Sequence, residues 1–251
     1  MLKVAGTIEA GPRQRLSVRL AHTPSEVLEA QRLRYRIFAD EMGARLPSRT
    51  AGIDQDIFDP YCDHLIVRDA DAGRIVGTYR LLAPHQARRI GGYYSETEFD
   101  LLRLRNLRES MVEVGRSCID ADYRTGAVIS LLWSGIASYM LRNRYDYLIG
   151  CASISMADGG RNAAALYHHL RDHYAPPEYR VFPRCRLPVE SLDSGAQGEP
   201  PPLVKGYLRA GAWVCGEPAW DPDFNTADLL LLLPMARVDR RYSRHFVERN
   251  G

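Results

Sequence analysis

The sequence predicts an α/β fold of the α+β kind, in which a mixed sheet is flanked by helices. Strand-like and helix-like segments follow one another in the order β-α-β-β-β-α-β-α-β. Two neighbouring strands are joined by a short turn as a hairpin, which a doubly wound parallel sheet does not contain. Of the 251 residues, 45% are hydrophobic and 25% are charged, so a sizeable core is available.

The first elements are a short strand over residues 16–20 and an amphipathic helix. Thr23 can cap this helix, Pro24 suits its first position, and Glu26 completes a capping box. The apolar residues that recur at helical spacing are Val27, Ala30, Leu33, Ile37 and Phe38. Arg34 lies within this stripe. A guanidinium on the core face needs a carboxylate partner, unless its stem packs there and its head reaches solvent.

The central part of the chain alternates strands, turns and a helix. Apolar runs at 64–68 and 74–82 flank a polar turn and predict a β-hairpin. The run 110–119 alternates like a strand, although an acid and a base lie in its apolar middle. A polar turn at 120–126 then leads into a long apolar helix over 128–143.

The remaining elements surround a stretch rich in Pro and Gly at 187–202, which is the only linker-like segment. They are expected at 147–152 (strand), 161–174 (helix), 212–215 (strand) and 228–233 (strand). We therefore expect a core over residues 1–186. Residues 187–251 are expected to form a linker and a C-terminal extension that packs on this core.

Composition limits the possible partners. A net charge of +2 is too small to indicate nucleic-acid binding. Arginines cluster at positions 32, 34 and 36, at 103, 105 and 108, and at 237, 240, 241 and 244. Such clusters are solvated faces or docking sites for an acidic carrier protein or anionic lipid. The five cysteines form no Cys-x-x-Cys pair, which argues against a metal site and for reduced thiols in the cytoplasm. No apolar run reaches membrane-spanning length.

Three carboxylates precede the predicted hairpin: Asp54, Asp56 and Asp59. Their spacing lacks the Gly and the distal Glu of an EF-hand, and such a cluster alone is typical of a solvated turn. Arg34 on the helix and Arg80 in the hairpin change this interpretation. Together these five residues predict a buried ion network that could hold a cationic substrate.

Glu113 is the candidate general base. Strand alternation puts Glu113, Gly115 and Ser117 on one face and Arg116 on the other. A partly desolvated Glu has a raised pKa, which suits proton abstraction near neutral pH. The alternative is a Glu that is salt-bridged to a nearby Arg. Gly115 lets a ligand or a second backbone approach the strand closely.

The turn after this strand is the candidate donor site. Arg124, Thr125 and Gly126 lie just before the long helix, whose free N-terminal N–H groups can bind an anion. The turn resembles the pyrophosphate turn of N-acetyltransferases that use acetyl-CoA, but it has only one Gly. The chain contains no nucleophile-elbow pattern, so covalent catalysis is not favoured.

Several short motifs resemble known enzymes when taken together and in order. Those that resemble the acyl-homoserine-lactone synthase branch of the GNAT-like superfamily are residues 33–38, the three aspartates at 54, 56 and 59, residues 79–82 and Glu113-x-x-Arg116. Those that more closely resemble the L-ornithine Nα-acyltransferases of ornithine lipid synthesis are residues 62–67, 113–118, 205–208 and 216–224. The similarity spans residues 32–246.

This resemblance implies a GNAT-like acyltransferase core over residues 1–186, whose central strands splay to admit a pantetheine arm. It implies transfer of a 3-hydroxyacyl group from acyl carrier protein to the α-amine of L-ornithine, which gives lyso-ornithine lipid. The donor is the 4′-phosphopantetheine of the carrier, and no cofactor is permanently bound. One phosphate needs no full Gly-rich cradle, which accounts for the short turn from Arg124 to Gly126.

The resemblance also implies roles for the candidate residues. Glu113, directly or through a water, takes a proton from the acceptor ammonium, and backbone N–H groups near Gly115 to Ser117, Arg116 included, or in the following turn stabilise the oxyanion. Asp54, Asp56 and Asp59, organised by Arg34 and Arg80, are expected to shape the acceptor pocket and neutralise the second ammonium. Phe38 is a further expected substrate-binding residue. Partners are then acyl carrier protein and L-ornithine, with a peripheral contact to anionic lipid on the inner membrane face.

Three alternatives stay open at this point. The lactone synthases carry a Trp shortly after the first helix, where this chain has Met42 and Gly43, so S-adenosylmethionine binding is disfavoured. Another amino acid could replace ornithine as the acceptor. A module that binds acyl carrier protein without catalysis is the alternative from a different class, and the presence of Glu113 argues against it.

Overall fold

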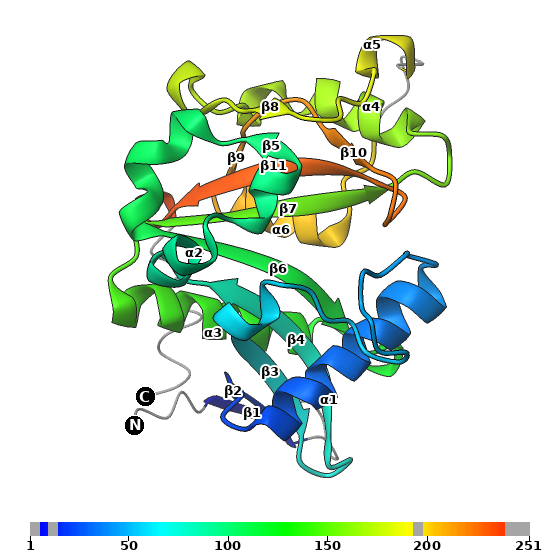
Figure 1. The fold of residues 1–251 in the computed structure, drawn as a ribbon, viewed down its shortest axis with the longest axis vertical. Helices are drawn as coiled ribbons and strands as arrows, with labels where there is room; N and C mark the ends of the chain where they lie inside the picture. Colours follow the sequence, from blue (N-terminus) through cyan, green and yellow to red (C-terminus); the bar gives the residue numbers. More distant parts are fainter. Residues whose placement is uncertain (1–5, 10–14, 193–197, 239–251) are drawn as a thin grey trace.

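The computed structural model describes residues 6–9, 15–192 and 198–238, and a nine-stranded sheet dominates it (Figure 1). The strand order is β1-β2-β3-β4-β6-β7-β11-β10, with β9 paired to β11 beside this path. The strands are β1 (Gly6–Glu9), β2 (Arg15–Leu20), β3 (Asp63–Asp69), β4 (Arg74–Leu82), β6 (Met111–Ile119), β7 (Tyr147–Ser155), β9 (Trp213–Val214), β10 (Ala219–Asp221) and β11 (Thr226–Pro234). Only β6 and β7 pair in parallel among these described strands. The predicted mixed sheet is confirmed.

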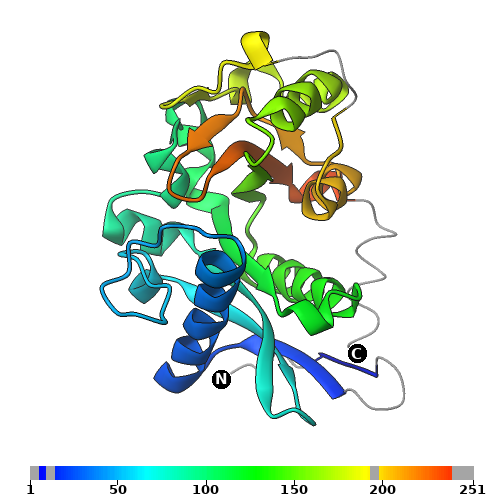
Figure 2. The same ribbon diagram turned by 90° about the vertical axis from the view of Figure 1, so that its right-hand side faces the viewer.

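Helices cover both faces of the sheet, with α1 and α3 on opposite sides (Figure 2). The α-helices are α1 (Pro24–Tyr35), α2 (Pro84–Ile90), α3 (Ala127–Asn143), α4 (Arg161–His169), α5 (Val189–Leu192) and α6 (Pro202–Arg209). A π-helix, η1 (Arg36–Glu41), continues α1. The 3-10 helices are η2 (Asp59–Tyr61), η3 (Tyr94–Thr97), η4 (Leu102–Ser110), η5 (Ala121–Tyr123), η6 (Arg171–His173), η7 (Pro177–Tyr179) and η8 (Met235–Arg237). The strands β5 (Phe99–Asp100) and β8 (Phe182–Pro183) form a separate small sheet.

Helix α1 begins where its sequence predicts, but the capping box is incomplete. The Thr23 hydroxyl accepts from the N–H of Glu26 at 3.3 Å. The Glu26 carboxylate accepts from the N–H of His22 at 2.8 Å and pairs with Arg19, whereas its contact with the N–H of Thr23 is the weakest of those that lower its pKa. The hydrogen bond from Arg19 lowers the pKa of Glu26 to about 2. A charged partner at the end of β2 therefore holds this side chain outside the box.

The core lies on both faces of the sheet. On the α3 face, a continuous apolar cluster joins β2, β3, β4, β6, β7 and β11 to α3, α4 and α6. On the other face, one cluster lies under α2 and η4, and a second lies under α1. None of the helices in the described part of the chain is long and apolar enough to cross a membrane.

Residues beyond the expected boundary at 187 contribute an inner strand near one end of the sheet. All nine residues of β11 are buried, and β11 pairs with β7 from Thr226↔Ser155 to Pro234↔Tyr147. A strand that is apolar on both faces is stable only when both faces are covered, so it lies inside the sheet. β11 is thus inserted between β7 and β10 instead of packing on the sheet from outside. The basic residues at 240, 241 and 244 lie outside the described part.

Candidate active site

The parallel strands β6 and β7 separate after a short stretch of pairing. Three registered pairs join them, Met111↔Tyr147, Val112↔Leu148 and Glu113↔Ile149. Beyond this point the two strands part and form a fork that opens toward Ile119 and Ser155. Gly150 lies just past the last pair, where a Cβ atom would come within 2.5 Å of the carbonyl oxygen of Val114. The absence of a side chain at Gly150 therefore permits the two backbones to approach this closely.

The fork contains a cavity of about 200 Å³. Residues 113–117 of β6 line one wall and residues 148–153 of β7 line the other. Its polar side includes Arg80, Tyr94 and Asp228, whereas leucines at 148, 203, 231 and 233 supply an apolar side. Alternation along β7 and β11 explains this division, because successive side chains point to opposite faces of the sheet. The cavity thus joins a polar region on one face to an apolar region on the other.

The predicted ion network is present and buried beside this cavity. Arg34 Nε lies 2.7 Å from Asp54 Oδ2, and Arg34 Nη2 lies 2.8 Å from Asp59 Oδ1. Arg80 Nη1 contacts Asp56 Oδ1 at 2.7 Å and Asp59 Oδ2 at 2.9 Å. The Arg34 side chain is 0% exposed, so the expected carboxylate partners are found. Burial opposes ionisation of Asp59, but the charges of Arg34 and Arg80 outweigh it and lower its pKa.

Arg116 completes the network and balances its charge. Its Nε lies 3.3 Å from Asp54 Oδ2, and its Nη2 lies 3.4 Å from Asp56 Oδ2. Three guanidinium groups therefore face three carboxylates. The role expected of the aspartates, neutralising a second substrate ammonium, requires a free negative charge that this balanced network does not offer.

Glu113 is buried at the closed end of the fork and is held by three donors. Oε2 accepts from the N–H of Tyr94 at 2.6 Å, and Oε1 accepts from the N–H of Ser95 at 2.7 Å and from the Ser95 hydroxyl. Burial raises the pKa of Glu113, although these hydrogen bonds oppose the change. Its partners are N–H and hydroxyl groups, and no Arg of the described residues lies within salt-bridge distance of it. The alternative of a salt-bridged Glu is therefore not seen.

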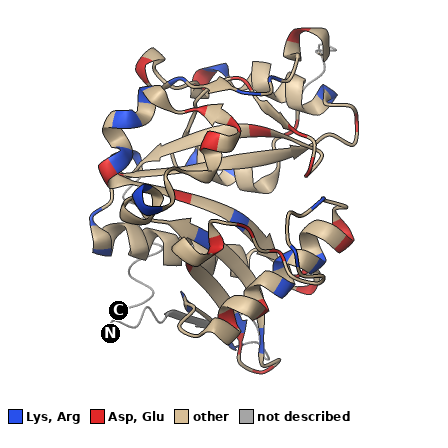
Figure 3. Cartoon of the chain, in the orientation of Figure 1, with Lys and Arg blue, Asp and Glu red and all other residues tan. Residues whose placement is uncertain are grey.

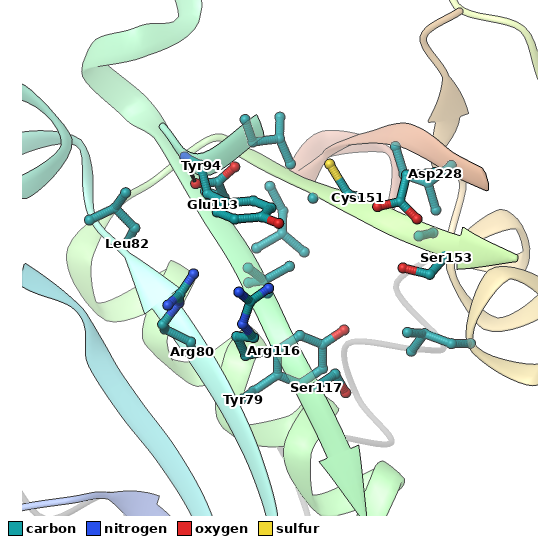
Figure 4. Close-up of a pocket in the computed structure, with 18 of the residues that line it drawn as sticks. Tyr79, Arg80, Leu82, Tyr94, Glu113, Arg116, Ser117, Cys151, Ser153 and Asp228 are labelled. Carbon is teal, nitrogen blue, oxygen red and sulfur yellow. Dashed lines mark hydrogen bonds between the residues drawn. The ribbon is translucent and has the colours of Figure 1, made fainter. Parts of the chain in front are cut away.

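The expected division of faces along β6 is wrong at Arg116. Arg116 has a φ of +49°, which breaks the alternation of the strand. Its guanidinium therefore lies on the same side as Glu113 (Figure 4), over the rings of Tyr94 at 5.0 Å and Phe224 at 4.7 Å. Ser117 instead lies beside Tyr79 (Figure 4). The network and the two rings hold Arg116 in this uncommon conformation.

Phe38 and the turn after β6 lie at the periphery of the cavity. Phe38 lines it and packs edge to face with Phe224 at a centroid distance of 5.8 Å. Arg124 pairs with Glu41 at 2.6 Å and donates to the carbonyl of Ile119 at 3.0 Å. Thr125 and Gly126 are exposed, and Gly126, with a φ of +93°, caps α3. The turn is thus at the open end of the fork, and it does not line the cavity.

A second acidic group, which was not predicted from the sequence, borders the far wall of the cavity, where Cys151 and Asp228 line it. Glu98, Cys151 and Asp228 bring one ligand atom each to within 4.8 Å of one another. Cys151 and Asp228 lie side by side across the fork from Glu113 (Figure 4). Asp228 at the start of the leucine run 229–233 was the one available signal, because a charge on a buried strand needs a partner. The three are far apart in sequence, so their spacing contains no motif.

Several arginines gather on an edge of the molecule that lies away from the turn at the start of α3 (Figure 3). Arg88 and Arg89 are exposed on α2, and Arg103 and Arg105 are exposed on η4. Arg142 lies in the last turn of α3. Since α3 has 17 residues, this edge is about 25 Å from the turn at the start of the helix.

Residues 33–134 match a family model described as an acetyltransferase (GNAT) domain. The chain is 38% identical over 249 residues to L-ornithine Nα-acyltransferase of Brucella abortus, covering 92% of this chain and 88% of that protein. It is 36% identical over 250 residues to the L-ornithine Nα-acyltransferase of Rhodobacter capsulatus, covering 92% and 95%.

Solved structures show the same fold at low sequence identity. The CoA-dependent acyl-homoserine lactone synthase BjaI aligns with a TM-score of 0.55 and 15% identity, over 91% of this chain and 83% of that one. FeeM, an N-acyl amino acid synthase from uncultured soil microbes, aligns with a TM-score of 0.50 and 14% identity, over 89% and 92%. The expected GNAT-like fold related to the autoinducer synthases is thus confirmed.

Proposed function

The chain belongs to the family of L-ornithine Nα-acyltransferases, and from this premise we propose that it transfers a 3-hydroxyacyl group from acyl carrier protein to the α-amine of L-ornithine. The product is lyso-ornithine lipid, the first intermediate of ornithine lipid synthesis. The observation that carries the proposal is the fork between β6 and β7, with buried Glu113 at its closed end. A fork of this kind admits a thin pantetheine arm, and its apolar side suits an acyl chain.

The reaction is direct attack of the amine on the thioester. Glu113, directly or through a water, takes one proton from the α-ammonium, and the neutral nitrogen attacks the thioester carbon. The tetrahedral intermediate collapses, the amide C–N bond remains, and the C–S bond breaks. The departing sulfur receives the second proton of the nitrogen. A raised pKa suits Glu113 to this task, because a base works best when its pKa lies near the operating pH.

The oxyanion is stabilised by backbone N–H groups of β6. Beyond Glu113 this strand has no β7 partner, so N–H groups that would have paired with β7 face the cavity instead. The candidates lie from Gly115 to Ser117, all of which line the cavity. Preorganised donors in such a partly dry site stabilise developing charge effectively.

The ion network acts as a frame for the acceptor side. Asp54, Asp56 and Asp59 hold Arg80 and Arg116 at the cavity wall, and Arg34 fixes two of these aspartates from below. Arg80 and Arg116 line the cavity, so their guanidinium N–H groups can donate hydrogen bonds to the carboxylate of the amino acid. Phe38 closes the same side together with Phe224.

The carrier protein docks at the open end of the fork. Arg124 is half-exposed there, and Thr125 and Gly126 precede the free N–H groups of α3, where one phosphate of 4′-phosphopantetheine can bind. The separate arginine edge on α2 and η4 is then available for a peripheral contact with anionic lipid. Flotation with anionic and neutral vesicles tests that contact.

One assay decides the main proposal. The purified chain is incubated with a 3-hydroxyacyl carrier protein and an equimolar mixture of amino acids, and the acylated product is identified by mass spectrometry. Nα-acyl-ornithine with a free δ-amine is the expected product. A lactone formed on addition of S-adenosylmethionine, or another acylated amino acid, would refute the assignment. Glu178→Gln, at an exposed position, serves as the control for charge changes away from the fork.

A further inference from the structure

Glu98 and Asp228 form an acidic pair that the mechanism above does not use. Asp228 is 4% exposed and lines the cavity. Its Oδ1 and both carboxyl oxygens of Glu98 are buried, and among the described residues none of these atoms has a hydrogen bond of good geometry. The two carboxyls interact chiefly with each other, with Cys151 beside Glu98 and Ser153 beside Asp228. No Lys, Arg or His of this described part forms a salt bridge with either carboxyl. Ionised carboxylates only accept hydrogen bonds, so the two groups can satisfy each other only by holding a proton between them.

A third acidic residue, Asp221, also acts on the pair. Burial and then the charge of Asp228 raise the pKa of Glu98 to about 9, with Asp221 adding to the effect. Burial likewise raises the pKa of Asp228. A buried pair of acids without a cation is destabilising, because at least one must stay protonated. A ligand that brings one positive charge and several N–H donors would remove this cost.

The site suits an ammonium group better than a metal ion. Its three ligand atoms lie within 4.8 Å of one another, so one nitrogen above them can reach each at hydrogen-bonding distance. Cys151 Sγ lies 3.4 Å from Ser95 Oγ as a donor, and burial raises its pKa well above the usual value. Cys151 is therefore a neutral thiol in the ligand-free site, so a metal ion would have to displace its proton, whereas an ammonium group would not.

Two residues link the acidic pair to the proposed base. The Ser95 hydroxyl binds Glu113 and is also in contact with Cys151, which borders the acidic pair. Only Ser95 and Cys151 thus separate the proposed base from this pair. The α- and δ-nitrogens of ornithine are five bonds apart, which is about 6 Å in an extended chain.

We propose that the Glu98–Asp228 pair binds the second ammonium of the diamino acid acceptor and so selects ornithine over monoamino acids. This inference rests on the proposed function. An acceptor with an apolar side chain leaves the pair without a cation, so it loses affinity. The balanced network of Arg34, Arg80 and Arg116 takes no part in this selection.

The first test measures selectivity. Wild type, Glu98→Gln and Asp228→Asn are assayed with L-ornithine and with L-norvaline, which has the same carbon skeleton without the second amine. We expect each variant to lower the ornithine-to-norvaline ratio of kcat/KM by about tenfold or more. Most of the change is expected in the KM for ornithine. The exposed control Glu178→Gln leaves the ratio unchanged. An unchanged ratio in both variants would overturn the inference.

The second test does not depend on turnover. Ornithine is expected to raise the Tm of wild type more than norvaline does, and Glu98→Gln is expected to abolish this difference. The ligand-free Glu98→Gln variant is expected to melt a few degrees above wild type at pH 8, because one buried acid is removed. If wild type acylates no amino acid but this thermal pattern is present, the proposed function fails and the ammonium site stands. If ornithine is acylated and neither test responds to the variants, the proposed function stands and the ammonium site is refuted. One equivalent of divalent metal that wild type retains and Glu98→Gln loses would assign the site to a metal instead.

Discussion

Replacing Arg34 by Met tests whether the buried ion network determines the stability of the fold. The Arg34 side chain is 0% exposed and contacts Asp54 and Asp59 at 2.7 and 2.8 Å. Met fills much of the same volume but leaves both carboxylates without this partner. Removing one member of a buried ion pair costs about 3–5 kcal/mol, since the remaining charge stays desolvated. We expect Arg34→Met to lower the free energy of unfolding by that amount at pH 7.5.

Urea unfolding followed by far-UV circular dichroism measures this effect. The matched control is Arg32→Met, which makes the same change at an exposed position of the same helix. Surface substitutions of this kind alter stability by about 0.5 kcal/mol or less. The double variant Arg34→Met/Asp59→Asn should recover part of the loss, because it removes one of the uncompensated carboxylates.

The pH dependence gives a second, independent readout. The folded-state pKa of Asp59 lies below its ordinary value of 3.8. Its contribution to stability is therefore fully present above that value and is lost as the pH falls through the folded pKa. The difference between wild type and Arg34→Met should be largest near neutral pH and should shrink below about pH 4. A cost under about 1 kcal/mol, or one that does not change with pH, would refute the reasoning.

Three other predictions concern the fork and its ends. Glu113→Gln should slow acyl transfer by about 10²–10⁴-fold in single-turnover assays. Wild-type rates should rise with pH through the raised pKa of Glu113. Near-normal turnover in the variant would refute the role of Glu113 as the general base. Gly150→Ala places a Cβ 2.5 Å from the Val114 carbonyl oxygen and should lower the free energy of unfolding by about 1–3 kcal/mol, measured by thermal unfolding. The control Gly115→Ala has nothing within 4 Å of its Cβ and should leave this free energy unchanged. Arg124→Glu should raise the KM for the acyl carrier protein, most at low ionic strength, without changing the KM for ornithine; equal effects on both substrates would argue against docking at this turn.

Local patterns in the sequence were sufficient to predict the secondary structure around the site. The helix that starts after Thr23, the hairpin of β3 and β4, the strand β6 and the long helix α3 follow from periodicity and turn residues. The need for a partner of Arg34 was also visible, because a guanidinium within an apolar stripe must be compensated. The short helix α6 was missed, since its Pro-rich start is typical of a linker.

The direction of Arg116 depended on more than its own strand. Alternation predicts that it points away from Glu113, but the backbone at Arg116 has a positive φ. Asp54, Asp56, Tyr94 and Phe224 together provide the contacts that hold it there. These partners come from three other segments, and no local pattern contains them.

The sequence by itself determined which segments become strands and helices, and that Arg34 and Glu113 would be buried charges. Only the tertiary structure decided which charges are balanced and which are not. Arg34, Arg80 and Arg116 satisfy three aspartates, whereas Glu98 and Asp228 meet each other without a cation. Periodicity reflects contacts between residues a few positions apart, but the electrostatic free energy of a buried group depends on whichever groups the folded sheet brings beside it.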